Sequence, residues 1–164
     1  MLITTSRKPS AKTRQLCKAL SRVFSAECIN RGKMSMRDVF IKTSARGYET
    51  TLIINDFHGN PSKITFYGHQ GHEIISLDVN IVLPDSRLHI KPDDLSFKCD
   101  IVELSILKDI LPVKSDDEHN YSNLVWIKNT DKKYQAVMDF IDKNGDGTGL
   151  KIYIKYINTG DDVS

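Results

Sequence analysis

The sequence predicts an α/β fold, a mixed-sheet sandwich of strands and helices. Stretches with helical apolar spacing intermix along the chain with stretches in which apolar and polar residues alternate, which is typical of that class. The chain has 164 residues, of which 40% are hydrophobic and 27% charged, and these values suit a globular protein with a sizeable core. We therefore expect a single domain over residues 1–164.

The first 24 residues predict a strand, a turn and an amphipathic helix. Leu2–Thr5 is a short β-prone run, and residues 7–10 form the turn. From Ala11 onward, apolar side chains recur at helical spacing and form one stripe: Leu16, Leu20, Val23 and Phe24. Three cations stack on the opposite side of this helix: Arg14, Lys18 and Arg22. Like charges at this spacing repel by a few tenths of a kcal/mol per pair, so the row favours an anionic ligand.

A second helix is expected from Met36 to about Arg46. Ser35 and Asp38 match a capping box at its start, and Gly47 suits its end. The polar loop that precedes it reads Asn30-Arg31-Gly32-Lys33, in which the glycine is expected to supply an unusual backbone angle. Free amides and the helix dipole favour a phosphate at such a helix N-terminus.

The middle of the chain predicts β-sheet. Thr50–Phe57 and Lys63–Tyr67 flank turn residues 58–61 and should pair as a hairpin. The clearest strand alternation runs over Ile75–Leu83. Leu95–Leu111 supports two interpretations, because strand-like alternation at its start gives way to helical spacing at its end.

The last third predicts a strand, a helix and a final strand. Leu124–Lys128 is the first strand, in which Trp126 is expected to join the core. Apolar spacing predicts a helix over Asp131–Lys143, followed by a turn and a strand over Lys151–Ile157. The strand, turn and helix of this region share the plan of the first 24 residues, which permits a duplicated unit.

Charge is distributed unevenly along the chain. The first 47 residues contain eleven basic residues and two acids, a net charge of +9, so the remainder carries −7 of the total of +2. Such a basic third is suited to a polyanion. The candidate binding residues are Arg7, Lys8, Lys12, Arg14, Lys18, Arg22, Arg31, Lys33, Arg37, Lys42 and Arg46. We expect these cations to converge on one exposed patch.

Cysteine usage and hydropathy predict a cytoplasmic protein. Cys17, Cys28 and Cys99 are widely spaced and form no C-x-x-C pair, so we expect free thiols. No apolar run approaches the roughly 18 residues of a membrane span. The N-terminus becomes basic before an apolar signal segment forms, which argues against a secretory signal.

Metal and catalytic motifs are weak. Asp142-Lys143-Asn144-Gly145-Asp146-Gly147 resembles the start of a calcium loop, but Tyr153 occupies the twelfth position where a glutamate is needed, so a turn is the favoured interpretation. A metal at the histidines is the less favoured alternative, since glycines favour a loop there: His58, His69 and His72. No nucleophile elbow, Walker loop or dinucleotide fingerprint occurs. We expect no cofactor, no metal and no enzymatic activity.

The opening of the chain resembles the Brix-domain family. The resemblance rests on Leu2-Ile3-Thr4-Thr5-Ser6-Arg7-Lys8-Pro9-Ser10, on Thr13-Arg14, on Leu20 and on Asn30-Arg31-Gly32-Lys33-Met34-Ser35. The short length is similar to that of archaeal-type members. The resemblance implies a ribosome biogenesis protein, with ribosomal RNA or its precursor as ligand. It carries a binding role to Arg7, Lys8, Arg14, Arg31 and Lys33, whereas the other cations enter only through the charge argument.

The same resemblance implies two similar halves, approximately residues 1–83 and 84–164. Each half is expected to resemble the anticodon-binding domain of class II aminoacyl-tRNA synthetases. These are expectations from the family and not from periodicity.

Three hypotheses follow for function. The leading one is a non-enzymatic RNA-binding assembly factor, with base stacking by the basic surface unexpected because Phe24, its one aromatic before Phe40, lies on the buried stripe. The second is a scaffold that docks a basic ribosomal or ribonucleoprotein-particle protein on its acidic part, such as Asp116, Asp117 and Glu118. The third is an RNA-processing enzyme.

Overall fold

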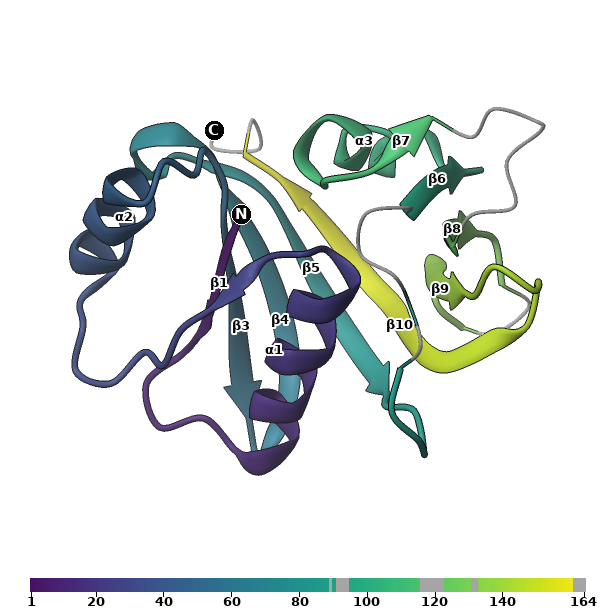
Figure 1. Cartoon of the computed structure of the whole chain (residues 1–164), viewed down its shortest axis with the longest axis horizontal. Coiled ribbons are helices and arrows are strands. Elements are labelled where there is room, and N and C mark those ends of the chain that lie inside the picture. The colour runs from purple at the N-terminus through teal and green to yellow at the C-terminus, as the bar shows by residue number, and fades with distance from the viewer. Residues whose placement is uncertain (89, 91–94, 116–122, 131–132, 161–164) are drawn as a thin grey trace.

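A ten-stranded mixed sheet forms the frame of the protein (Figure 1). The computed structural model describes residues 1–88, 90, 95–115, 123–130 and 133–160. The first five strands are β1 (Leu2–Thr5), β2 (Glu27–Cys28), β3 (Thr51–Phe57), β4 (Asn60–Tyr67) and β5 (Glu73–Val82). The other five are β6 (Leu95–Cys99), β7 (Lys114–Ser115), β8 (Asn123–Lys128), β9 (Ala136–Ile141) and β10 (Gly147–Thr159). The helices are α1 (Ala11–Val23), α2 (Met36–Ala45) and α3 (Leu107–Ile110), with short 3₁₀ turns η1 (His69–Gly71) and η2 (Val102–Leu104).

The order of strands is symmetric about the centre of the sheet. It reads β2-β1-β3-β4-β5-β10-β9-β8-β6-β7. In one set β1 lies parallel to β2 and β3, and in the other β6 lies parallel to β7 and β8. The remaining neighbours are antiparallel, and β5 and β10 join the two sets. The predicted mixed sheet is thereby confirmed.

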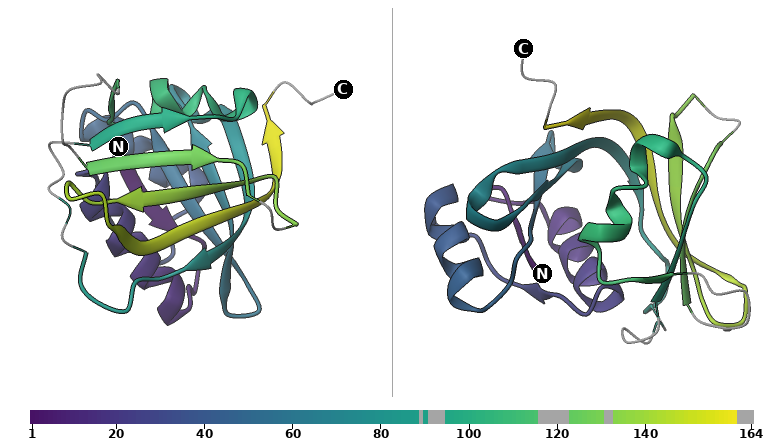
Figure 2. Two further views of the ribbon diagram at one scale, coloured as in Figure 1. Left: turned by 90° about the vertical axis from the view of Figure 1, so that its right-hand side faces the viewer. Right: turned by 90° about the horizontal axis from the view of Figure 1, so that it is seen from above.

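Helix α1 lies inside the curve of the sheet, and its predicted apolar stripe is buried there: Leu16, Leu20, Val23 and Phe24. The rings of Phe24 and Phe140 meet with centroids 6.0 Å apart, so this core spans both sets of strands. The view from above shows β1 between α1 and α2 (Figure 2, right). Helix α2 therefore covers the opposite face, where Val39 packs with Leu2 and Ile53.

Local signals placed both long helices correctly. Ser10 caps α1 by accepting a hydrogen bond from the amide of Thr13. Ser35 and Asp38 form the predicted capping box of α2, and the hydrogen bonds from Ser35 to the carboxylate lower the pKa of Asp38. Gly47, just past the end of α2, has a φ of 79°, which glycine adopts without strain.

The helix predicted over Asp131–Lys143 is wrong: its described part contains strand β9 instead. Residues 136–140 are buried in succession, and all but Asp139 are apolar, a pattern that fits a covered strand as well as a helix. These residues form a strand because β9 pairs with β8 along one edge and with β10 along the other. The suggested repeat of the first 24 residues near residue 124 is therefore wrong too. In the strand order the counterpart of β1 is β6.

Trp126 lies on the sheet surface and not in the core. The view onto β8, β9 and β10 shows these strands with α1 and α2 behind them (Figure 2, left). The indole of Trp126 is half-buried, donates to Asp100 Oδ2 at 3.0 Å and has Lys98 Nζ and Lys128 Nζ at 4.3 and 4.5 Å from its ring centre. Alternation along β8 points Val125 and Ile127 inward and leaves the indole outside.

Two of the three cysteines are not free thiols. Cys17 of α1 and Cys28 of β2 form a disulfide, with their Cα atoms 6.4 Å apart. The sequence spacing could not show this, because the pair meets only when α1 packs beside β2. Cys99 remains free, and burial raises the pKa of its thiol. None of the described helices has the length and apolar character needed to span a membrane.

Replacing Cys28 by serine should lower the free energy of unfolding by about 2–3 kcal/mol, because the disulfide closes a short loop in the unfolded chain. Urea unfolding of the oxidised protein and the variant measures the difference. Cys99→Ser is the matched control and should leave the midpoint nearly unchanged. Equal midpoints for the oxidised protein and the Cys28 variant would show that this crosslink contributes no stability.

Candidate nucleic-acid interface

A crevice opens where two parallel strands end. The chain leaves β1 toward α1 on one face of the sheet, and it leaves β2 toward α2 on the other. The two connecting loops diverge from the carboxyl ends of neighbouring strands, which is where α/β sheets form ligand crevices. The cavity between these loops and α1 has a volume of about 870 Å³.

Cations from three separate segments line this crevice. They come from the turn after β1, the solvent side of α1 and the loop before α2: Arg7, Lys8, Arg14, Lys18, Arg31 and Lys33. Its described lining contains no carboxylate. Six of the eleven cations singled out in the sequence are therefore brought together, and the crevice attracts anions.

Arg31 holds the crevice in shape. Its side chain is buried, with Nε donating to the carbonyl of Met34 at 2.7 Å and Nη1 donating to the carbonyl of Thr5 at 3.0 Å. Burial, with a smaller contribution from the nearby charge of Arg7, lowers the pKa of Arg31. These bonds tie the loop before α2 to the end of β1. Gly32 turns beside it with a φ of 53°, as its predicted role requires.

The other five cations lie outside this crevice. Lys12 lines a separate cavity, and Arg22 is exposed in the last turn of α1. Arg37 and Lys42 belong to α2 on the opposite face of the sheet, and Arg46 pairs with Glu27. The expectation of one patch for all eleven was therefore too broad, because α2 lies on the other face of the sheet and α1 brings only Arg14 and Lys18 into the crevice.

Part of the crevice lining is apolar, which sequence reasoning missed. Pro9, Ile29 and the Cys17–Cys28 disulfide lie among the cations. These residues come from a turn, a helix and a strand, so no local spacing joins them. The crevice therefore combines apolar groups with cations.

Asp56 anchors the start of α1 and was also missed. Its carboxylate accepts hydrogen bonds from the amide of Ser10 at 2.5 Å and from the hydroxyl of Thr13. The amide of Asp56 in turn donates to Ser6 Oγ at 3.3 Å. A carboxylate at a helix N-terminus also interacts favourably with the helix dipole. Asp56 thereby fixes both ends of the Arg7-Lys8 turn, although it stands more than 40 residues away in the sequence.

The motifs weighed for metals have other structural roles. In the hairpin between β9 and β10, Asp142 Oδ1 accepts from the amides of Asn144 at 2.9 Å and Asp146 at 3.0 Å, which is the favoured turn. His72 Nδ1 lies 2.9 Å from the carbonyl oxygen of His69. Across the described residues, no group of three or more potential metal ligands is assembled. The acidic segment 116–118 lies outside the described residues, so the docking hypothesis stays a prediction.

Comparison with known proteins shows similarity over the whole chain. No family model matches. A probable Brix domain-containing ribosomal biogenesis protein of Methanothermobacter thermautotrophicus is 32% identical over 170 residues, covering 98% of this chain and 100% of that protein. A protein of the same description from Methanosarcina mazei is 44% identical over 77 residues, or 47% of each chain.

Solved structures of similar proteins share this fold. The crystal structure of Mil, an archaeal Imp4-like protein, superposes with a TM-score of 0.84 at 31% identity and covers 97% of this chain and 99% of that one. A probable ribosomal biogenesis protein from Aeropyrum pernix K1 has a TM-score of 0.72 at 22% identity, with 94% of each chain covered, and shares the fold.

Asp56→Ala should lower the free energy of unfolding by about 2 kcal/mol, because the amide of Ser10 and the hydroxyl of Thr13 lose a charged acceptor. Chemical denaturation measures the loss. Asp78→Ala is the matched control: this strand carboxylate forms only a partly exposed ion pair with Lys63, so its loss should cost less than about 1 kcal/mol. Equal losses for the two variants would contradict an anchoring role.

Proposed function

The chain belongs to the Brix domain-containing ribosomal biogenesis proteins, and on this premise we propose that it is a non-enzymatic RNA-binding assembly factor. In this proposal the crevice at the ends of β1 and β2 holds the phosphate backbone of ribosomal RNA or its precursor. The protein would keep a segment of that RNA in position while the particle assembles.

One observation carries the proposal. Cations from three segments surround one crevice, and its described lining has no carboxylate to neutralise them. Arginine offers phosphate a planar fork of donors, whereas lysine offers a mobile point charge. Arg7 and Arg14 supply the first kind of contact in this proposal, and Lys8, Lys18 and Lys33 supply the second.

The placement of the helices supports the same ligand. The segments that lead into α1 and α2 both line the crevice, and the positive end of a helix dipole favours an anion near the start of a helix. Arg31 is assigned a supporting role here, because its side chain is buried and two of its five N–H donors bind the carbonyls of Thr5 and Met34. Phosphate contacts of this kind position a protein on RNA and do not by themselves read sequence.

The division into halves 1–83 and 84–164 is also part of the proposal. The symmetric strand order supports it, since five strands in each set follow one plan. A likeness of each half to the anticodon-binding domain of class II aminoacyl-tRNA synthetases remains a prediction from the family.

The double reversal Arg14→Glu with Lys18→Glu should weaken binding to transcribed ribosomal RNA fragments at least about 10-fold, because it replaces two attractive charges by two repulsive ones. Affinity measured over a range of salt should also fall steeply for the unaltered protein, with a slope of about −0.7 on a log–log plot per phosphate contacted on single strands.

The matched control reverses Arg37 and Lys42 on α2, which lie on the other face of the sheet. It should change the affinity less than about 2-fold, whereas a flat salt response or equal effects of the two double variants would refute the proposed surface. Circular dichroism before binding confirms that each variant is folded.

A further inference from the structure

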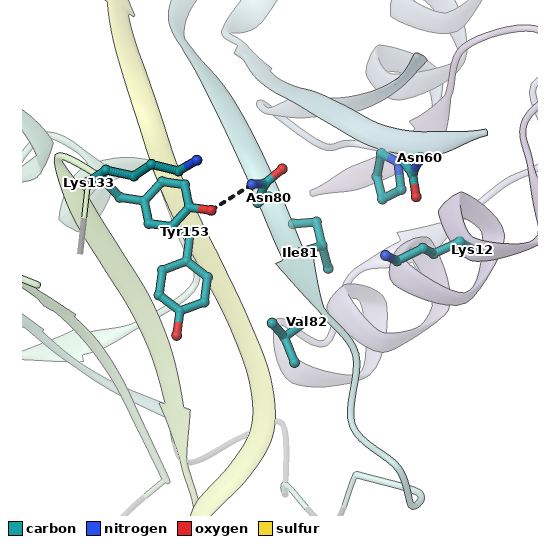
Figure 3. A pocket seen from close by; sticks show the side chains of 9 residues that line it. Lys12, Asn60, Asn80, Ile81, Val82, Lys133 and Tyr153 are labelled. Carbon is teal, nitrogen blue, oxygen red and sulfur yellow. Dashed lines mark hydrogen bonds between the residues drawn. The ribbon is translucent and has the colours of Figure 1, made fainter. Parts of the chain in front are cut away.

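A second cavity opens at the middle of the sheet. The ladder between β4 and β5 stops at the Lys63–Asp78 pair, but β5 continues to Val82, which pairs with Lys151 of β10. The end of β5 therefore extends past its neighbour on one side. The space beside it has a volume of about 690 Å³ and is drawn in Figure 3.

Two tyrosine rings line one side of this cavity. Tyr153 projects from β10, and Tyr134 comes from the segment before β9. Their ring centres are 4.9 Å apart with planes inclined at 34°. Aromatic rings offer flat faces on which nucleobases stack, whatever the base.

A hydrogen bond holds this pair beside β5. Asn80 Nδ2 donates to the hydroxyl oxygen of Tyr134 at 2.7 Å, as the dashed line in Figure 3 marks. Asn80 also faces Tyr153 across the ladder between β5 and β10. An amide and a phenol hydroxyl each donate and accept, so the cavity presents groups that can pair with the edge of a base.

Positive charge flanks the rings. Lys12 of α1 lines one side of the cavity and Lys133 lines the other, and the described lining includes no carboxylate (Figure 3). Lys12 stands in the first turn of α1, the helix that carries Arg14 and Lys18 into the basic crevice. One helix thus contributes cations to both cavities.

We propose that this second cavity binds an unpaired nucleobase of single-stranded RNA. The base stacks on the Tyr134–Tyr153 pair, and Lys12 and Lys133 bind the phosphates on either side of it. This inference rests on the proposed function for the nature of the ligand and adds the class of RNA, an unpaired segment whose base leaves the stack. Sequence-specific recognition of RNA depends mainly on such splayed bases.

The test compares three probes on the full chain: a 12-nucleotide oligouridylate, an abasic ribose-phosphate chain of the same length and a blunt RNA duplex. Binding is measured by fluorescence anisotropy of an end label. We expect the oligouridylate to bind more tightly than the abasic chain. Tyr153→Leu should weaken oligouridylate binding about 10-fold and change duplex binding less than about 2-fold, because stacking is lost and the phosphate contacts remain.

Two further variants test the stacking role of the tyrosine rings. Tyr134→Phe keeps the ring and removes its bond to Asn80, so stacking should persist with a smaller loss. Tyr156→Ala is the matched control, since Tyr156 is another exposed tyrosine of β10 that does not line the cavity, and it should bind oligouridylate normally.

Equal affinity for oligouridylate and the abasic chain would overturn the inference, and so would equal losses for the Tyr153 and Tyr156 variants. These results leave the proposed function standing if the Arg14 and Lys18 reversal weakens duplex binding at least about 10-fold. If that reversal leaves duplex binding intact, the proposed function fails on its own.

Discussion

Burial of one side of α1 inside the curved sheet determines where the cations of the first third can lie. Leu16 and Leu20 are at most 1% exposed, and each such side chain contributes about 1.5–3 kcal/mol when it leaves water. Because the apolar side of α1 is buried in the core, its opposite side faces outward, and Arg14 and Lys18 therefore line the crevice. Asp56 then fixes where the helix begins. The electrostatics of the site are therefore a consequence of packing.

In the proposed function, the basic crevice and the second cavity, which we call the tyrosine cavity after Tyr134 and Tyr153, recognise different parts of RNA. The crevice concentrates charge at the ends of parallel strands, where loops diverge and leave room for phosphate. The tyrosine cavity lies where β5 extends past β4, and it offers rings and an amide instead. Lys12, on the helix that serves both, lies at the second cavity. The two sites together would bind the backbone at one place and a base at another.

The symmetric sheet also explains why total charge is uninformative. In the first set of strands, β1 is followed by Arg7 and Lys8; in the second, the counterpart β6 is followed by Asp100 and Glu103. The segment that follows β1 and the equivalent segment that follows β6 thus carry opposite charges. Residues 1–83 carry a net charge of +6 and residues 84–164 carry −4, so the total of +2 conceals a basic and an acidic half.

Sequence alone determined the features that depend on residues close together in the chain. These are α1 and α2 with their caps, most strands, and the identity of the cations. It failed over Asp131–Lys143, because the apolar residues around Asp139 fit a buried strand as well as a helix, and only the pairing of β9 with β8 and β10 distinguishes the two. Tertiary structure alone decided which cations meet and the anchoring of α1 by Asp56. It also decided the disulfide between Cys17 and Cys28. Periodicity and capping act over a few residues, whereas these contacts join segments that approach only after the sheet has formed.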